Sequence, residues 1–132
     1  MPGETILIVD DNATNLKLAR VLLTALGYAT LTAVDADDAL ARLREYRPEL
    51  ILMDLQLPGM DGFALTRALK DSPDTMTIPI VALTAYAMKG DDERARAAGC
   101  DGYVTKPIDA NMLTATIEEC LARSRGGEAP PS

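Results

Sequence analysis

Short apolar runs alternate with amphipathic segments along the whole chain. Five such runs predict β-strands, at Thr5–Val9, Ala29–Ala33, Leu50–Met53, Ile78–Leu83 and Gly102–Thr105. The first run has aliphatic residues at consecutive positions, which is typical of a parallel strand covered on both faces. Pro79 is tolerated only at the start of its strand, because proline has no N–H to donate to a sheet.

Between these runs, apolar residues recur at helical spacing. This spacing predicts helices over Ala13–Leu26, Ala36–Leu43, Leu65–Leu69, Ala87–Ala98 and Leu113–Leu121. Asn12 and Asp35 are suited to cap the first two helices, and Gly27 is suited to end the first. Gly- and Pro-rich residues from Ser124 onward predict a disordered tail over 124–132, after a single domain over 4–123.

The strict alternation of strands and helices predicts an α/β fold. Short right-handed crossovers favour a doubly wound, five-stranded parallel sheet with helices on both faces. In such sheets the ligand site lies beyond the carboxyl ends of the strands, near the point where the strand order reverses. Residues that bind a ligand or take part in catalysis are therefore expected at the carboxyl ends of the strands.

Composition narrows the range of functions. The 132 residues, 48% apolar and 25% charged, fit one globular domain, and the net charge of −7 argues against nucleic acid as a direct partner. Histidine is absent, which excludes Ser-His-Asp, Cys-His and HExxH chemistry in this chain. There is no signal peptide and no apolar run long enough to span a membrane, and Cys100 and Cys120 are not in CxxC spacing. These features predict a cytoplasmic protein with reduced cysteines.

Three carboxylates stand at predicted strand ends: Asp10 and Asp11 after the first strand, and Asp54 after the third. If those strands are neighbours, the acids converge and repel one another unless a cation is present. Oxygen ligands without His or Cys favour Mg²⁺. The alternative is that each acid is a solvated loop residue or a helix cap.

The other two strand ends carry a hydroxyl, on Thr84, and an ammonium group, on Lys106. Together with the acids and a divalent ion, they offer what a phosphoryl group needs, because its oxygens must be neutralised during transfer. Asp54 would then accept the phosphoryl group. Taken singly, Thr84 could instead cap a helix and Lys106 could be a surface lysine.

The ordered motifs ILIVDDN, LILMDLQLPGMDG, VALTA and GYVTKP resemble the receiver domains of two-component response regulators. The resemblance implies the flavodoxin-like strand order 2-1-3-4-5 and makes Asp54 the phospho-acceptor. It assigns Mg²⁺ to Asp10, Asp11, Asp54 and the backbone carbonyl of Gln56. It also implies a switch pair, Thr84 and Tyr103, and contacts from Lys106 to the phosphoryl oxygens. The turn that aims Lys106 at the pocket implies a cis peptide bond before Pro107.

The resemblance further implies a histidine kinase or a histidine phosphotransfer protein as phosphodonor, and a downstream kinase or regulator as partner. Two surfaces are expected to serve them: the face of the fourth helix, last strand and last helix, and an apolar stripe on the first helix. The first helix carries two such stripes, one of Leu18, Val21, Leu22 and Ala25 and one of Leu16, Ala19, Leu23 and Leu26. One stripe must face the sheet, and the other could pack on the last helix instead of staying accessible.

We therefore expect a stand-alone receiver, a monomer or weak dimer, whose only catalysis is its own Mg²⁺-dependent phosphorylation and dephosphorylation. Alternatives are a receiver excised from a hybrid histidine kinase and a Mg²⁺-dependent phosphatase-like enzyme. The latter would need a second acid two residues after Asp54, where Gln56 stands. A flavin-binding protein of the same fold would need a Ser/Thr/Gly-rich phosphate loop, where this chain has two acids.

Overall fold

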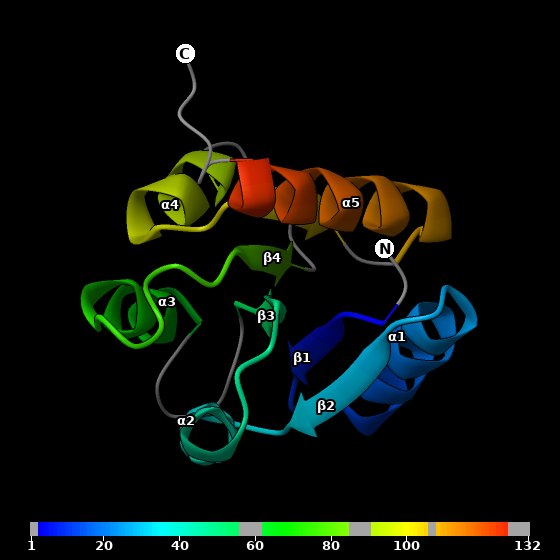
Figure 1. The fold of residues 1–132 in the computed structure, drawn as a ribbon, viewed down its shortest axis with the longest axis horizontal. Helices are drawn as coiled ribbons and strands as arrows, with labels where there is room; N and C mark the ends of the chain where they lie inside the picture. Colours follow the sequence, from blue (N-terminus) through cyan, green and yellow to red (C-terminus); the bar gives the residue numbers. More distant parts are fainter. Residues whose placement is uncertain (1–2, 56–61, 85–90, 106–107, 127–132) are drawn as a thin grey trace.

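A five-stranded parallel sheet forms the centre of the computed structural model, which describes residues 3–55, 62–84, 91–105 and 108–126 (Figure 1). The strand order is β2-β1-β3-β4-β5, so the predicted doubly wound α/β fold is confirmed. The strands are β1 (Thr5–Val9), β2 (Ala29–Ala33), β3 (Leu50–Asp54), β4 (Ile80–Thr84) and β5 (Gly102–Thr105).

Helices cover both faces of the sheet (Figure 1). They are α1 (Ala13–Ala25), α2 (Ala36–Glu45), α3 (Gly62–Asp71), α4 (Asp91–Ala98) and α5 (Ala110–Gly126). Alternate strand residues point to opposite faces. Ile8 and Leu52 therefore pack with α1 and α5, while Val9 and Met53 pack with α2, α3 and α4.

The first two helices begin at the predicted caps. The Asn12 side chain accepts a hydrogen bond from the backbone N–H of Asn15, and Asp35 accepts one from Asp38. Helix α1 ends one residue earlier than predicted, with Leu26 as its C-cap. Gly27 follows with a φ of 96°, a left-handed conformation that glycine adopts without a steric penalty.

Strand β4 begins later than the apolar run suggested. Ile78 and Pro79 precede it, and the strand starts at Ile80, whose N–H donates to the Asp101 carboxylate at 2.9 Å. Pro79 still contributes its carbonyl, which accepts from the N–H of Ile51 at 2.9 Å. The missing N–H of proline therefore shifts the start of the ladder without removing Pro79 from the sheet edge.

The predicted start of the disordered tail is wrong by three residues, because α5 continues through Ser124 to Gly126. The Arg123 guanidinium donates to the carbonyl of Asp101 at 2.7 Å, which fixes the last turns of α5 against the loop before β5. The Gly-rich sequence begins only at Gly126. Residues 127–132 lie outside the described part of the chain, so the rest of the tail stays a prediction.

The two apolar stripes of α1 have different environments. Ala19 and Leu23 are fully buried against the sheet, whereas Leu18 and Val21 are 42% and 58% exposed. The stripe with Ala19 and Leu23 therefore faces the sheet and shares a core cluster with α5, and the stripe with Leu18 and Val21 is the accessible one. Helix α1 presents an apolar strip to solvent.

A membrane-spanning helix would have to be long and apolar throughout, and no helix in the described ranges meets both conditions.

Candidate functional site

The three predicted acids come together at the carboxyl edge of the sheet. Strands β1 and β3 are neighbours, with Val9 paired to Met53, so Asp10 and Asp54 occupy the next position on each strand. One carboxylate oxygen from each of Asp10, Asp11 and Asp54 lies within 4.8 Å of the others. Asp10 and Asp54 are only 1% and 2% exposed, while Asp11 is open to solvent.

The local sequence after β1 holds this cluster in place. The Asp10 carboxylate accepts a hydrogen bond from the backbone N–H of Asn12 at 2.9 Å. The Asn12 side chain in turn caps α1. The turn from strand to helix therefore fixes Asp10 in a buried position and leaves the next residue, Asp11, at the open side of the cluster.

The donor set of this cluster fits a divalent metal ion. Two buried carboxylates and a third within 4.8 Å place several negative charges in a region of low dielectric constant, where their repulsion is strong. All three donors are carboxylate oxygens, with one side open at Asp11. Mg²⁺ prefers such oxygen ligands and retains some of its waters, for which the open side leaves room.

Gly62, the last residue of the motif LILMDLQLPGMDG and the first residue of α3, contacts the end of β3 directly. Its N–H donates to the carbonyl of Leu55 at 3.2 Å. A Cβ atom at this position would lie 2.4 Å from the carbonyl oxygen of Asp54 and 2.5 Å from the Cα of Leu55. Only glycine fits here, so Gly62 fixes the backbone that carries Asp54.

Thr84 and Tyr103 lie on the same face of the sheet. Thr84, the last residue of β4, pairs with Thr105, and Ala82 pairs with Tyr103. Alternation along β5 puts Tyr103 on the face of Thr105, and hence of Thr84. Thr84 is 4% exposed and Tyr103 is half-buried against the α2–α4 core.

A cation–π contact connects the beginning of α3 to α4. The Arg94 guanidinium lies 4.4 Å from the centre of the Phe63 ring. Phe63 directly follows Gly62, so α4 is linked to the segment that supports Asp54. A contact between helices separated by a strand leaves no pattern in the sequence, so this link is visible only in the structure.

Several predicted features lie outside the described residues. These are the backbone carbonyl of Gln56, the side chain of Lys106, the cis bond before Pro107 and the predicted helix start at Ala87. They stay predictions. Within the described residues, the acids and Thr84 lie at one edge of the sheet, as the sequence indicated.

Comparison with known proteins identifies the family. Residues 6–118 match the response regulator receiver domain. This chain belongs to the response regulator receiver family. Receivers of this family act in two-component signalling with histidine kinases and downstream effectors, and they are not classical enzymes.

Curated relatives make the likeness more specific. The polar-differentiation response regulator DivK of Brucella anthropi is 46% identical over 118 residues, which cover 89% of this receiver and 96% of DivK. The DivK of Brucella ovis is 45% identical over the same share of both chains. The likeness therefore extends over nearly the whole length of these regulators.

Solved structures share the fold. One is the receiver domain of a sensor histidine kinase from Pseudomonas aeruginosa PAO1, which has a magnesium ion coordinated in its active site cleft. It is 33% identical to this receiver and has a TM-score of 0.83. The match covers 91% of this receiver and 98% of that chain. A CheY-like receiver domain protein from Methanospirillum hungatei is 28% identical, with a TM-score of 0.86 over 95% and 98%.

Proposed function

We propose that this receiver accepts a phosphoryl group on Asp54 from a phosphohistidine of a histidine kinase or a histidine phosphotransfer protein. In this step an oxygen of the Asp54 carboxylate forms a bond to phosphorus while the phosphorus–nitrogen bond breaks and the imidazole leaves. The observation that carries the proposal is the convergence of three carboxylates within 4.8 Å at the end of the sheet. The given sequence has no histidine, so the donor imidazole lies outside these 132 residues.

Asp10, Asp11, Asp54 and the backbone carbonyl of Gln56 would hold the Mg²⁺. When bound, the ion supplies positive charge that offsets the negative charge of the phosphoryl oxygens. The clustered acids support this assignment, and so does the magnesium ion in the Pseudomonas receiver. Burial of Asp10 and Asp54 keeps these groups fixed, which favours an in-line approach to the phosphoryl group.

Thr84 and Lys106 complete the proposed site. The hydroxyl of Thr84 donates a hydrogen bond to a phosphoryl oxygen, and the ammonium group of Lys106 contributes a second, charged donor. The position of Thr84 at the end of β4, next to the acceptor strand, supports its part in this scheme.

Phosphorylation is proposed to change a partner surface through Thr84 and Tyr103. The phosphoryl group adds about −1.5 to −2 charges and three acceptor oxygens, which draw Thr84 toward Asp54. Tyr103 faces the small side chain of Ala82 across the β4–β5 pair, which leaves space for the ring to turn inward. The change is carried to the α4-β5-α5 face, where a downstream kinase or regulator binds.

The exposed strip of α1 is proposed to receive the phosphodonor. Leu18 and Val21 lie on the helix that directly follows Asp10 and Asp11, so a protein bound there is close to the acid cluster. An apolar strip of this kind is typical of a protein contact.

The cellular role proposed here is that of a single-domain, cytoplasmic regulator similar to DivK, acting as a monomer or weak dimer. Coverage of 96% of the Brucella anthropi DivK supports it. The alternative is a receiver of a hybrid kinase, which the likeness to the Pseudomonas receiver favours. A phosphatase-like enzyme has less support, because Gln56 replaces the second acid that such an enzyme needs.

Intact mass spectrometry tests the acceptor. With acetyl phosphate and Mg²⁺, the wild-type chain should gain one phosphoryl group and Asp54→Asn none, because the amide is not a nucleophile. Asp74→Asn, a change of the same kind in an exposed loop, should behave as wild type. Asp11→Ala should need a higher Mg²⁺ concentration for the same uptake. Equal uptake by Asp54→Asn and wild type would refute the acceptor assignment.

The switch is tested with beryllofluoride as a phosphoryl mimic. Affinity for a cognate kinase should rise with beryllofluoride in the wild type, and this gain should be smaller in Thr84→Ala. Thr32→Ala, which removes a half-buried hydroxyl from β2 at the other side of the sheet, serves as the control. An undiminished gain in Thr84→Ala would rule out this switch.

A further inference from the structure

A groove lies between α2 and α3, near the edge of the sheet where β3 and β4 begin. Its volume is about 540 Å³, within the range of about 300–1,000 Å³ common for binding sites. The residues that line it include four aliphatic side chains and two arginines, which are Leu40, Leu43, Leu69, Ile78, Arg44 and Arg47.

The floor of the groove is apolar. Leu69 and Ile78 are 3% exposed and belong to the core, while Leu40 and Leu43 are half-buried and pack against it. Leu40 and Leu43 belong to the helical stripe that the sequence predicted to face the core. Their partial exposure in the structure leaves aliphatic surface accessible from the groove.

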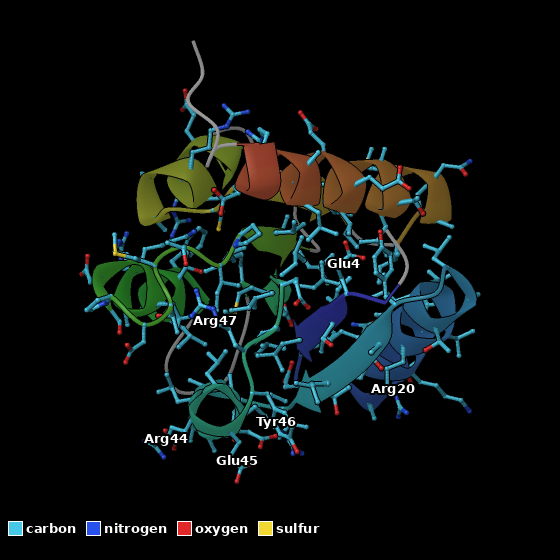
Figure 2. All side chains as sticks on the ribbon, viewed as in Figure 1. Glu4, Arg20, Arg44, Glu45, Tyr46 and Arg47 are labelled. Atoms are coloured by element: carbon cyan, nitrogen blue, oxygen red, sulfur yellow. The ribbon has the colours of Figure 1, made fainter. Side chains whose placement is uncertain are left out.

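The rim carries positive charge and an aromatic ring. Tyr46 is 50% exposed, and Arg44 and Arg47 are exposed beside it. Figure 2 shows Arg44 and Tyr46 at the end of α2 and Arg47 directed toward the space between α2 and α3. Among the described residues that line the groove, Asp74 is the only acidic one.

The charges of the two arginines are not neutralised by carboxylates of the described chain. Arg47 donates to the carbonyl oxygen of Asp74 and to the Thr77 hydroxyl, both uncharged acceptors. Neither Arg44 nor Arg47 forms an ion pair with a described acidic side chain. In a chain with a net charge of −7, this rim is a local site suited to carboxylates.

We propose that this groove binds a short extended peptide of a partner protein in which an apolar pair is flanked by carboxylates. The apolar side chains would contact the floor formed by Leu40, Leu43 and Leu69. The carboxylates would pair with the guanidinium groups of Arg44 and Arg47.

The groove is separate from the proposed phosphorylation site. Asp54 lies at the carboxyl end of β3, whereas Tyr46 and Arg47 precede the amino end of the same strand. A five-residue strand spans about 16 Å. Binding of the peptide should therefore not require Asp54. A test of the groove is independent of a test of the phospho-acceptor.

The probe is the capped tetrapeptide acetyl-Asp-Leu-Phe-Glu-amide, whose two carboxylates match the two arginines. Titrated into the ¹⁵N-labelled full chain and followed by NMR, it should shift backbone amides of Leu43, Arg44, Arg47 and Leu69 with a Kd on the order of 1 mM or tighter. The neutral isostere acetyl-Asn-Leu-Phe-Gln-amide should bind at least about 5-fold more weakly, because it cannot form ion pairs with Arg44 and Arg47.

Matched variants locate the site. Arg44→Glu should weaken the carboxylate peptide by about 5-fold or more, while Arg20→Glu should leave binding unchanged. Arg20 lies on α1, away from α2 in Figure 2, and its substitution changes the net charge by the same amount. Ala68→Trp, at the exposed side of the groove, should reduce binding by occluding it. Asp54→Asn should bind the peptide like the wild type.

Three outcomes would overturn the proposal. The first is the absence of amide shifts in the groove up to about 5 mM peptide, well above the expected Kd. The second is equal binding of the neutral isostere, or an equal loss in Arg20→Glu and Arg44→Glu. The third is a concentration-dependent shift of the same amides without peptide, which would assign the groove to a second copy of this chain.

Discussion

Charged side chains are arranged differently at the carboxyl edge of the sheet, where the strands end, and at the amino edge, where they begin. At the carboxyl edge, Asp10, Asp11 and Asp54 gather within 4.8 Å of one another. At the amino edge, where β4 and β5 begin, the ammonium group of Lys70 lies 2.9 Å from the Asp101 carboxylate. Like charges meet at one edge, and opposite charges are paired at the other.

Lys70 is at the centre of the polar contacts at the amino edge. Its ammonium group also donates to the carbonyl of Ile78 at 3.0 Å, and the Asp101 carboxylate accepts from the N–H of Ile80. These contacts join the end of α3 to the beginnings of β4 and β5. The comparison indicates that the amino edge contributes to stability, whereas the carboxyl edge gathers acids that repel one another and that are proposed to bind a cation.

The largest expected effect comes from the backbone contact beneath the acid cluster. Gly62→Ala should lower the free energy of unfolding by about 3 kcal/mol, because its Cβ would overlap the Asp54 carbonyl and the backbone would have to move. Urea denaturation measures it. Gly3→Ala, whose Cβ would meet no neighbour but whose φ is 107°, should cost only about 1 kcal/mol. Similar losses in both variants would contradict the close-contact argument.

Breaking the paired edge is expected to have the next largest effect. Lys70→Met keeps most of the packed stem but removes the charged donor, and should cost about 2 kcal/mol of unfolding free energy, since Asp101 and the Ile78 carbonyl lose a partner. Arg67→Met, an exposed change on the same helix, should stay within about 0.5 kcal/mol of wild type. Equal stability of the two variants would show that the Lys70 contacts contribute little.

Removing one charge at the carboxyl edge should have the opposite sign. Without divalent ions, Asp54→Asn should raise the free energy of unfolding by about 1 kcal/mol, because the repulsion from Asp10 and Asp11 is reduced. Added Mg²⁺ should stabilise the wild type and reverse the order. Asp74→Asn, in the exposed segment before β4 at the amino edge, should change the free energy of unfolding little with or without Mg²⁺. A loss of stability in metal-free Asp54→Asn would argue that the cluster is not strained by its charges.

The smallest effect concerns Cys100, which is buried just before β5. Burial, more than any other influence, raises the pKa of its thiol to about 11 from 9.0. Well below pH 9 the thiol is neutral in both the folded and the unfolded state, so its contribution to the free energy of unfolding is complete there. That contribution is lost as pH rises from 9 toward 11. At pH 9.5 the loss should be about 0.8 kcal/mol. Urea denaturation of wild type and Cys100→Ala at pH 8 and 9.5 measures it, and identical pH dependence would contradict the shift.

Much of this protein follows from local sequence pattern. The aliphatic runs and the helical spacing predicted, in order, the ten elements of the described residues. Strands buried on both faces and helices buried on one side produce these periodic patterns. The caps Asn12 and Asp35 were predictable because each needs only a hydrogen bond three residues along the chain. The acids were identified because each directly follows an apolar strand.

The candidate site was predicted only in part from the residues themselves. Asp10 and Asp54 can meet only if β1 and β3 are neighbours in the sheet. No local sequence pattern predicts the order of the strands. The resemblance of four motifs to receivers supplied that order, and the strand pairing in the structure confirms it.

Other features depended on the tertiary structure alone. Gly62 has an obligatory role because the first residue of α3 lies against the backbone of Asp54 and Leu55, a separation set by packing. Lys70 and Asp101 are 31 residues apart and meet only when α3 and β5 are assembled. The groove at Arg44 and Arg47 likewise exists only between two packed helices. The sequence by itself determined the elements and the kinds of groups at their ends, since these depend on near neighbours. The assembled sheet decided which distant groups meet, because those distances depend on how whole elements pack.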